Sequence, residues 1–438
     1  MSSVFALATP ATRSALCVFR VSGPGCLAAF DSIFTQALGE PRKFYQRSLM
    51  AGSTVVDTVG VIFFEGPSSY TGEDSFEIYA HGGLAVMGSI VDLFKSVGFD
   101  EAGPGEFTKR AFLNGRLSLS EAESVVDVIN ASSKEVLDIS LNSLRGGFSD
   151  EVFGFSKRLD SLRKFVEGSI DFSDEDYDFI KEGGVVDDIS RLCADFGGFV
   201  NKCFLAGETG LKKTVLFIGP PNSGKSSLFN RLLGFDRALV SDVPGTTRDL
   251  IESEVFYNNS SFKILDSAGI RETVDVVESK GIELAVNQIK NADVVVGVFD
   301  SVDPLVLLEI KSIASDNVFI SVLNKLDLGL KDKGALFDVS LSAKTGEGVV
   351  ELKKKISSAS AVRGLVDKEY FARNRHIKLF NEGLGHLEAA MIKLRSGFDV
   401  ELAAEDLKLA RISLDEVVGV KTSDSLLGDI FNDFCIGK

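Results

Sequence analysis

The stretch Gly219-Pro-Pro-Asn-Ser-Gly-Lys-Ser226 has the residue types and spacing that bind nucleotide phosphates. It follows an apolar run at 215–218 and precedes a helix-like run at 227–233. Glycines in such a loop let backbone N–H groups turn toward phosphate oxygens at a helix N-terminus. We expect Lys225 to reach the β- and γ-phosphates and Ser226 to ligate Mg²⁺. An ordinary glycine turn with an exposed lysine is the alternative, and the strand–loop–helix context disfavours it.

Three downstream motifs predict that the nucleotide is GTP. Asp266-Ser-Ala-Gly269 ends a strand-like run, where an Mg²⁺-associated aspartate and a γ-phosphate-sensing glycine belong. Asn324-Lys-Leu-Asp327 ends another apolar run, and Asp327 can accept hydrogen bonds from guanine N1–H and N2–H₂, which adenine cannot offer. Ser342-Ala-Lys344 should place a backbone N–H at guanine O6. In this order the motifs resemble the Ras-like GTPase fold. The predicted nucleotide-binding residues are Asn222, Ser223, Gly224, Lys225, Ser226, Ser227, Asp266, Gly269, Asn324, Lys325, Asp327, Ser342, Ala343 and Lys344.

Length and composition indicate a multidomain globular protein. The chain has 438 residues, of which 25% are charged and 45% hydrophobic, enough for two or three domains with separate cores. No apolar run reaches the length of about 18 residues that a membrane helix needs, and the N-terminus lacks a basic leader region. We therefore expect no signal peptide and no membrane span.

Cysteine usage and net charge narrow the function classes. The five cysteines are odd in number and include no C-x-x-C pair, which argues against a disulfide framework or zinc site and favours the reducing cytoplasm. A net charge of −16 argues against a general nucleic-acid coat protein, because phosphate neutralisation drives such binding. A local basic patch remains compatible with this charge. Lys109, Arg110, Arg373, Arg375 and Lys378 are candidates for RNA phosphate contacts, with a solvated surface as the equally weighted alternative.

The predicted fold class is α/β plus α, with a P-loop G domain inserted into a helical domain. Residues 1–116 read as a small α/β domain, with strand-like runs at 15–21, 58–64 and 75–80 and a helix at 84–97. Residues 117–207 form the first helical half, 208–365 the G domain and 366–438 the second helical half. Helices are expected near 370–396 and 401–418. Insertion is plausible because bundle termini lie close together at a surface.

Two local patterns support the helical assignment. Ser118-Leu-Ser-Glu121 is a capping box that opens a helix. A heptad-like apolar stripe then follows on one long helix, as an ordinary bundle core rather than a separate coiled coil. The stripe consists of Phe148, Val152, Phe155, Leu159, Leu162 and Val166. The acidic run at 171–178 is most simply a solvated turn, and His81 is more simply structural than catalytic.

The whole chain resembles the bacterial and organellar family of tRNA modification GTPases MnmE (TrmE). The specific motifs are Thr71-Gly-Glu-Asp, His81-Gly-Gly, Pro104-Gly-Glu-Phe, Gly245-Thr-Thr-Arg-Asp and the final Phe434-Cys-Ile-Gly-Lys. The resemblance implies a homodimer through N-terminal domains that bind 5,10-methylenetetrahydrofolate or 5-formyltetrahydrofolate. It also implies an FAD-dependent partner, MnmG, with which C5 of the wobble uridine of certain tRNAs is modified, and potassium-stimulated GTP hydrolysis.

The resemblance also implies particular site residues. The folate contacts correspond to Arg20, Glu77, Lys438 and Arg116. Arg116 stands where the family has a lysine, and a guanidinium differs from an ammonium in geometry. Cys435 is implied to lie near the modification site, against the alternative of a packing cysteine.

The hydrolytic step is expected to use a bound cation. Ile270 occupies the position where many small GTPases place a water-orienting glutamine, so another group must do that work. Asn222 with carbonyls of the 241–246 loop could hold K⁺ against the phosphates and neutralise developing charge. We expect K⁺ ligands from Asn222, Ser241, Val243 and Thr246, and Mg²⁺ ligands from Ser226 and Thr247. The catalytic candidates are Glu278, Arg248, Asp249 and Cys435, with Glu278 matching the family's water-orienting glutamate. A surface glutamate at a helix start is its alternative.

Two other functions are alternatives to tRNA modification. A ribosome-assembly GTP switch usually adds an RNA-binding module or a second G domain, and the sequence has one P-loop and no C-terminal basic Gly-x-x-Gly module. The other is a folate-dependent one-carbon transferase that its G domain only regulates.

Overall fold

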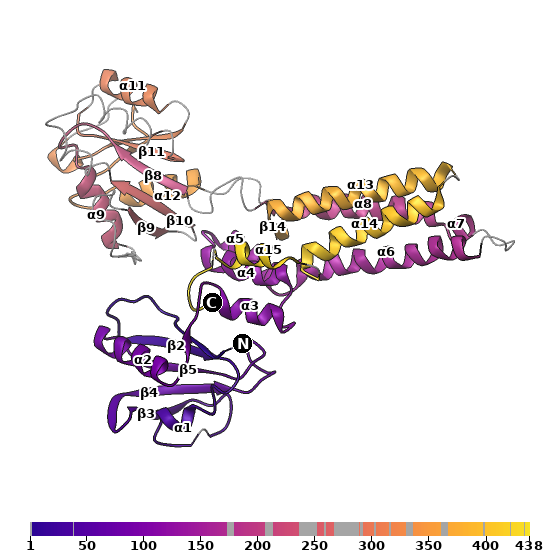
Figure 1. Cartoon of the computed structure of the whole chain (residues 1–438). Coiled ribbons are helices and arrows are strands. Elements are labelled where there is room, and N and C mark those ends of the chain that lie inside the picture. The colour runs from indigo at the N-terminus through magenta and orange to yellow at the C-terminus, as the bar shows by residue number, and fades with distance from the viewer. Residues whose placement is uncertain are drawn as a thin grey trace, which may run out of the picture. The chain divides into compact units, whose positions relative to one another are not determined.

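The computed structural model describes most of the chain. The chain divides into two compact units. The first unit comprises Met1–Ile129, Ser140–Cys203 and Glu369–Lys438, and the second comprises Asn130–Ile139 and Phe204–Lys368. Each is described by itself below (Figure 1). The described residues are 2–37, 39–172, 179–205, 213–235, 252–257, 260–266, 289, 292–301, 304–314, 317–329, 336–360, 367–396, 399–420, 422–432 and 434–438.

The N-terminal part of the first unit is built on a sheet with the strand order β3-β4-β5-β2-β1-β6. All pairs are antiparallel except β1 with β6. Buried and half-buried residues alternate along β5, because successive side chains point to opposite faces. The expected strands and helix of this domain are confirmed. The elements are β1 Val4–Leu7, β2 Leu16–Ser22, α1 Phe30–Ile33, β3 Tyr45–Ala51, β4 Thr54–Phe64, β5 Ser75–His81, α2 Leu84–Ser96, β6 Asp100–Glu101 and α3 Glu106–Leu113.

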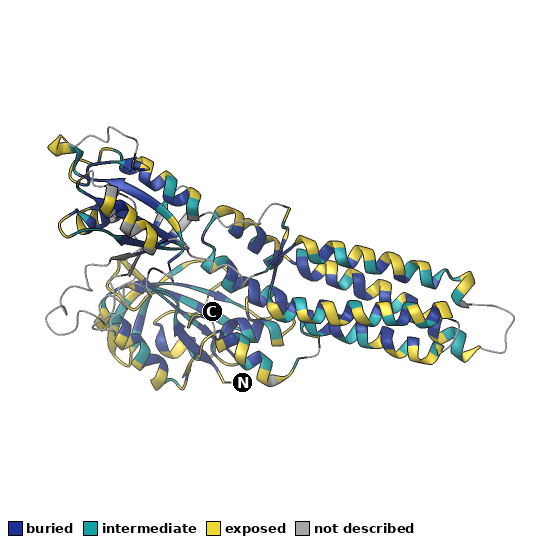
Figure 2. Cartoon of the chain, turned by 90° about the horizontal axis from the view of Figure 1, so that it is seen from above, coloured by how far each residue is buried: buried dark blue, intermediate teal, exposed yellow. Residues whose placement is uncertain are grey.

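Four helices from the two sides of the G-domain sequence share one core (Figure 1). They are α6 Gly147–Asp171, α8 Val185–Lys202, α13 Asn374–Ser396 and α14 Val400–Val418. The heptad-like stripe is confirmed as the buried face of α6, and Figure 2 shows buried faces turned inward along the bundle. Phe148 of α6 packs its ring 5.6 Å from Phe199 and 5.9 Å from Phe380. Burial of this shared face explains why the two halves fold together. The short α7, Phe179–Glu182, also packs here.

The expected helix at 370–396 begins later than predicted. Residues Tyr370–Ala372 form a strand, β14, and α13 starts only at Asn374. Tyr370 and Ala372 lie in the bundle core, and the Phe371 N–H donates to Ser143 Oγ over 3.0 Å. An extended backbone lets these apolar residues reach that core while the amide is satisfied by a side chain.

The capping box is confirmed at the start of α4 (Leu119–Asn130). The Ser118 N–H donates to Glu121 Oε2 over 2.7 Å, and the Glu121 N–H donates to Ser118 Oγ over 3.3 Å. Helices α4 and α15 (Asp424–Asn432) share a small core that includes Leu119 and Phe431. Helix α5 covers Lys134–Leu144.

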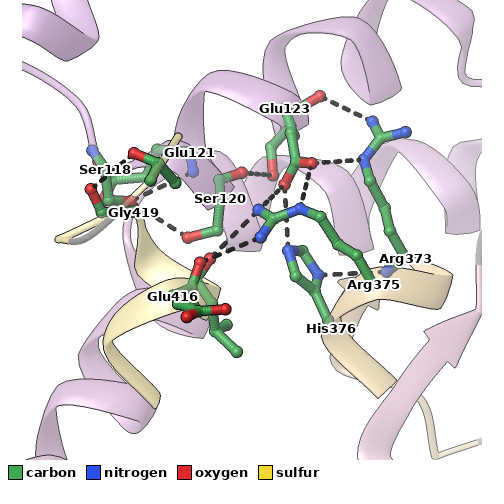
Figure 3. A network of polar contacts seen from close by, with 12 residues as sticks. Ser118, Ser120, Glu121, Glu123, Arg373, Arg375, His376, Glu416 and Gly419 are labelled. Atoms are coloured by element: carbon green, nitrogen blue, oxygen red, sulfur yellow. Dashed lines mark hydrogen bonds and ion pairs between the residues drawn. The ribbon is translucent and has the colours of Figure 1, made fainter. Parts of the chain in front are cut away.

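A buried ion-pair network joins α4 to the start of α13 (Figure 3). Glu123 accepts hydrogen bonds from Arg375 over 2.8 and 2.7 Å, and its Oε2 lies 3.1 Å from His376 Nε2. Arg373 lies 2.8 Å from Asp127. Burial by itself would raise the pKa of Glu123, but the charges and hydrogen bonds of His376 and Arg375 outweigh it and hold that pKa below its usual range. Burial raises the pKa of Asp127 to about 6.

This network corrects part of the predicted tRNA surface. Arg373 and Arg375 are half-buried, with side chains 33% and 17% exposed, and both are paired with carboxylates of α4. Arg110 is likewise buried and pairs with Glu73 and Glu106. Paired guanidinium groups are poor phosphate contacts, because binding would first require breaking these pairs. These contacts do not involve Lys109 and Lys378, whose assignment as phosphate contacts stays a prediction.

The second unit contains the G-domain sheet, with the order β13-β12-β11-β8-β10-β9. Its strands are parallel except for β9 with β10. Strand β8 lies between β10 and β11, so the strands that follow it in the sequence lie on both of its sides. Ligands of such sheets bind at the carboxyl end of the strand where the order reverses in this way. The elements are β8 Lys213–Ile218, α9 Lys225–Phe235, β9 Glu252–Tyr257, β10 Ser260–Asp266, β11 Val294–Phe299, α11 Pro304–Ile313, β12 Val318–Leu323, η2 Leu326–Leu328, β13 Val339–Ser340 and α12 Val349–Ser360.

Candidate nucleotide site and N-terminal pocket

The loop between β8 and α9 has a backbone that its glycines permit. Gly219 and Gly224 have φ values of +144° and +95°, in the region that L side chains rarely adopt. A Cβ on Gly219 would lie 2.1 Å from the Val298 carbonyl oxygen, and a Cβ on Gly224 would lie 2.2 Å from Asn324 Nδ2. Asn222 also has a positive φ, of 60°. The loop therefore curls tightly against the ends of β11 and β12.

The side chain of Lys225 is held across this loop. Its Nζ donates to the carbonyl oxygens of Gly219 over 2.9 Å and Pro220 over 2.8 Å. This places the ammonium on the concave side of the loop, where phosphate oxygens would bind. Ser226 and Ser227 follow in the first turn of α9 and are exposed. The predicted P-loop geometry is present.

Asn324 ties three segments of the site together. Its Nδ2 donates to the Ser223 carbonyl oxygen over 2.8 Å, and its Oδ1 accepts from the Ala343 N–H over 2.9 Å. The next residue, Lys325, lies 2.6 Å from Asp300 at the end of β11. Because the carboxyl ends of parallel strands meet at one edge, these distant motifs converge there.

The Asp327 carboxylate is held in place by a neighbouring hydroxyl group. Ser342 Oγ donates to Asp327 Oδ1 over 2.7 Å and accepts from the Thr345 N–H over 3.1 Å. A hydroxyl fixed in this way limits the rotation of the Asp327 carboxylate. A fixed acceptor pair suits the N1–H and N2–H₂ donors of guanine. Arg231 of α9 donates to the Ala343 carbonyl oxygen over 2.8 Å and to that of Lys344, which fixes the loop that carries them.

Several predicted residues lie outside the described residues. They are Ser241, Val243, Thr246, Thr247, Arg248, Asp249, Gly269, Ile270 and Glu278. Asp266 is the last residue of β10, and its side chain is also outside the described part. The described residues of the predicted site are therefore those of the loop at 219–227 and of the segments at 324–327 and 342–344.

A cavity of about 240 Å³ lies in the N-terminal domain. Three of the four predicted folate contacts, Arg20, Glu77 and Lys438, line it together. Aromatic rings and hydroxyl groups form most of the remaining wall. The lining residues are Arg20, Val21, Ser22, Arg42, Phe64, Ser69, Tyr70, Thr71, Ser75, Phe76, Glu77, Phe107 and Lys438. Arg116 is not among them: it is exposed, and its side chain lies against Gly72 beside this wall.

Glu77 is held by two neighbours. Arg20 Nε donates to Glu77 Oε1 over 2.8 Å, and the Tyr79 hydroxyl donates to Glu77 Oε2 over 2.7 Å. Tyr79 stands two residues along β5 and therefore on the same face as Glu77. Burial and the Glu77 carboxylate raise the pKa of Tyr79 to about 12, which keeps it a hydrogen-bond donor. This arrangement fixes both carboxylate oxygens of Glu77.

The last residues of the sequence pack on the N-terminal domain. Arg20 donates to the Gly437 carbonyl oxygen over 3.1 Å, and the Phe107 N–H donates to the Lys438 carbonyl oxygen over 3.1 Å. Burial, and next the Arg20 charge, lower the pKa of Lys438. Cys435 is exposed on this segment. The segment brings Lys438 to residues more than four hundred positions away.

Sequence reasoning missed Arg42 and Tyr79. Arg42 lines the cavity, and its guanidinium stacks over the Phe64 ring at 5.5 Å. Nothing in its local sequence marks it as a site residue. Tyr79 had a usable signal, since it stands at i+2 from Glu77 on a predicted strand. His81 is 71% exposed, and its Nδ1 lies 2.9 Å from Asp57.

Among the described residues no helix is both long and apolar enough to cross a membrane. Models of two families match the chain. The MnmE helical domain model matches residues 119–435, and the model of the GTP-binding protein TrmE N-terminus matches residues 3–116. A G domain of the T. maritima FeoB iron transporter is a solved structure with 30% identity, covering 34% of this chain and 99% of that chain, with a TM-score of 0.28.

Relatives of known name cover the full length of this chain. Proteins named tRNA modification GTPase MnmE are 35% identical in Thermosipho melanesiensis and 37% identical in Legionella pneumophila, each over 100% of this chain. They are covered over 99% and 100% of their own length. A third, from Histophilus somni, is 34% identical over 100% of this chain and 99% of its own. On these matches, together with the converging P-loop, Asn324 and Ser342 segments, the chain belongs to the family of tRNA modification GTPases MnmE.

Proposed function

We propose that this protein couples GTP hydrolysis to modification of C5 of the wobble uridine of certain tRNAs. As a member of its family it is a GTP hydrolase. The observation that supports the proposal is the joint presence of a P-loop, an Asp327 carboxylate held by Ser342, and a cavity lined by charged residues, in a chain with full-length relatives named tRNA modification GTPase. A tRNA substrate is consistent with the cytoplasmic location that we propose.

In the hydrolytic step, Asp327 and Ser342 select guanine, and the loop of Gly219 to Ser226 holds the phosphates. Lys225 supplies a positive charge at the β- and γ-phosphates. Ser226, exposed in the first turn of α9, suits an Mg²⁺ ligand, and the ion would neutralise charge on those phosphates. Asn222, exposed on the left-handed turn of the loop, is the described residue that suits K⁺, with Ser241, Val243 and Thr246 as further proposed ligands. Thr247, Arg248, Asp249 and Glu278 are proposed to complete the catalytic machinery.

The proposed stimulation of GTP hydrolysis by K⁺ is tested by measuring GTP turnover in KCl and in NaCl. We expect faster turnover in KCl, and loss of that stimulation in Asn222→Ala with retained GTP binding, because the side-chain carbonyl is an oxygen ligand. Equal rates in both salts would refute this part while leaving the nucleotide site in place.

The cavity of the N-terminal domain is proposed to bind the tetrahydrofolate donor, either the 5,10-methylene or the 5-formyl form. Glu77 would accept hydrogen bonds from the ring N–H groups, and Arg20 and Lys438 would meet polar atoms of the ligand. Arg116 is proposed at the edge of this site. Cys435, exposed on the same terminal segment as Lys438, is proposed to face the reacting tRNA base. Binding of 5-formyltetrahydrofolate to the full chain, measured by calorimetry, tests this assignment.

The proposed assembly is a homodimer that joins two copies of the FAD-dependent partner MnmG in a heterotetramer. Reconstitution with the partner, tRNA, GTP and the folate donor, followed by mass spectrometry of the nucleosides, tests the whole function. We expect modified wobble uridine with the wild-type chain and none with Lys225→Ala. Modification that persists in Lys225→Ala would instead select a folate-dependent transferase that the G domain only regulates. GTP-dependent co-sedimentation with ribosomal subunits would favour the ribosome-assembly function.

A further inference from the structure

Arg42 is a fixed positive group at the rim of the N-terminal cavity. Its backbone N–H donates to the Phe63 carbonyl oxygen over 2.9 Å, which anchors the residue beside β4. Its guanidinium stacks over the Phe64 ring at 5.5 Å and donates to the Ser68 carbonyl oxygen. A guanidinium placed by stacking and by a backbone acceptor loses little freedom when it binds a further partner.

The cavity has two chemically different ends. At one end Glu77 is paired with Arg20, and their side chains are only 22% and 29% exposed. At the other end Phe64 pairs with Ser75, two residues before Glu77 on β5, a spacing of about 7 Å along the strand. Arg42 lies over Phe64 and is exposed. The half-buried carboxylate and the exposed guanidinium therefore stand apart in one cavity.

The charges of the lining side chains favour an anionic ligand. Three positive side chains, Arg20, Arg42 and Lys438, line the cavity with one carboxylate, Glu77. Arg20 is already engaged by Glu77 and by the Gly437 carbonyl oxygen. Such a positive pocket contrasts with the net charge of −16 of the whole chain. It can attract a ligand that carries carboxylates.

We propose that Arg42 binds the glutamate carboxylates of the tetrahydrofolate, so that the site prefers folates with a glutamate tail. The inference rests on the proposed folate function. A reduced folate has ring N–H donors at one end and carboxylates at the other. The donors match Glu77, and the carboxylates then reach the rim, where the planar fork of Arg42 can pair with them in bidentate fashion.

The test compares three ligands on the full-length chain by calorimetry. They are 5-formyltetrahydrofolate with one glutamate, the same folate with five glutamates, and a tetrahydropteroate that lacks the tail. Arg42→Met keeps an unbranched side chain over Phe64 and removes the charge, whereas Arg42→Lys keeps the charge without the fork. The neighbouring Lys43→Met is the matched control, because Lys43 pairs with Glu40 and is absent from the lining residues.

We expect Arg42→Met to lower the affinity for the one-glutamate folate by about three- to fivefold, a magnitude typical of an exposed charge pair. The substitution should lower the affinity for the five-glutamate folate at least as much and leave the affinity for the tail-less ligand unchanged. Arg42→Lys should recover part of the loss, and Lys43→Met should bind all three as the wild type does.

Two results separate failure of the inference from failure of the function. If the wild-type chain binds none of the three ligands, the proposed folate function is refuted. If it binds them, but Arg42→Met lowers all three affinities equally or none of them, the tail assignment is overturned and the folate site stands. A thermal unfolding curve of Arg42→Met that matches the wild type shows that the variant is folded.

Discussion

Replacing Glu123 with glutamine should destabilise the first unit strongly. The Glu123 side chain is 3% exposed and receives two hydrogen bonds from Arg375 at 2.8 and 2.7 Å, with His376 Nε2 at 3.1 Å. Removing one partner of a buried ion pair costs about 3–5 kcal/mol, because the other charge is left desolvated. Glutamine keeps one acceptor oxygen, so we expect the free energy of unfolding to fall by about 3 kcal/mol, at the lower end of this range. At roughly 2 °C per kcal/mol for a large unit, Tm should fall by about 6 °C.

The assay is differential scanning calorimetry of the full chain at neutral pH, with Glu382→Gln as the matched control. Glu382 pairs with Lys378 at 3.8 Å on the surface, and its loss should move Tm by less than about 1 °C, because exposed pairs contribute little. A Glu123→Gln transition within about 1 °C of the wild type would refute the view that this network stabilises the packing of α4 against α13.

The same pair of proteins makes a pH prediction with a definite sign. Because its neighbours lower the pKa of Glu123 below the ordinary 4.5, the folded state favours the carboxylate. Below pH 4.5 the stability advantage of the wild type over Glu123→Gln should therefore decrease as the pH falls, because the unfolded state takes up a proton on this carboxylate more readily than the folded state. An advantage that grew as the pH fell below 4.5 would contradict this account.

Three further outcomes are expected. Gly224→Ala should abolish GTP binding in a nucleotide-binding assay, because its Cβ would lie 2.2 Å from Asn324 Nδ2 at a φ of +95°. Asp327→Asn should lower GTP affinity by at least about a hundredfold and favour xanthosine triphosphate, because an amide can donate to the oxygen at C2 of xanthine; unchanged nucleotide preference would count against base recognition by Asp327. Tyr79→Phe should weaken 5-formyltetrahydrofolate by about fivefold while keeping the ring contact with Phe44, since the lost hydroxyl no longer orients Glu77; equal affinity would remove Tyr79 from the site.

The sequence alone identified the features that depend on local spacing. The P-loop, the capping box at Ser118 and the apolar stripe on α6 follow from residue periodicity and the stereochemistry of glycine. The order of the GTPase motifs also resembles the Ras-like GTPase fold, and the structure carries their loops to one edge of a parallel sheet.

Only the tertiary structure decided which charged residues are used within the first unit. Arg373 and Arg375 look like surface cations in the sequence, yet they are half-buried and pair with the buried carboxylates of Glu123 and Asp127. Arg42 carries no local signal, and it joins the cavity only because its loop packs on β4. The physical reason is that burial and charge pairing depend on neighbours distant in sequence, whereas helical and strand periodicity do not.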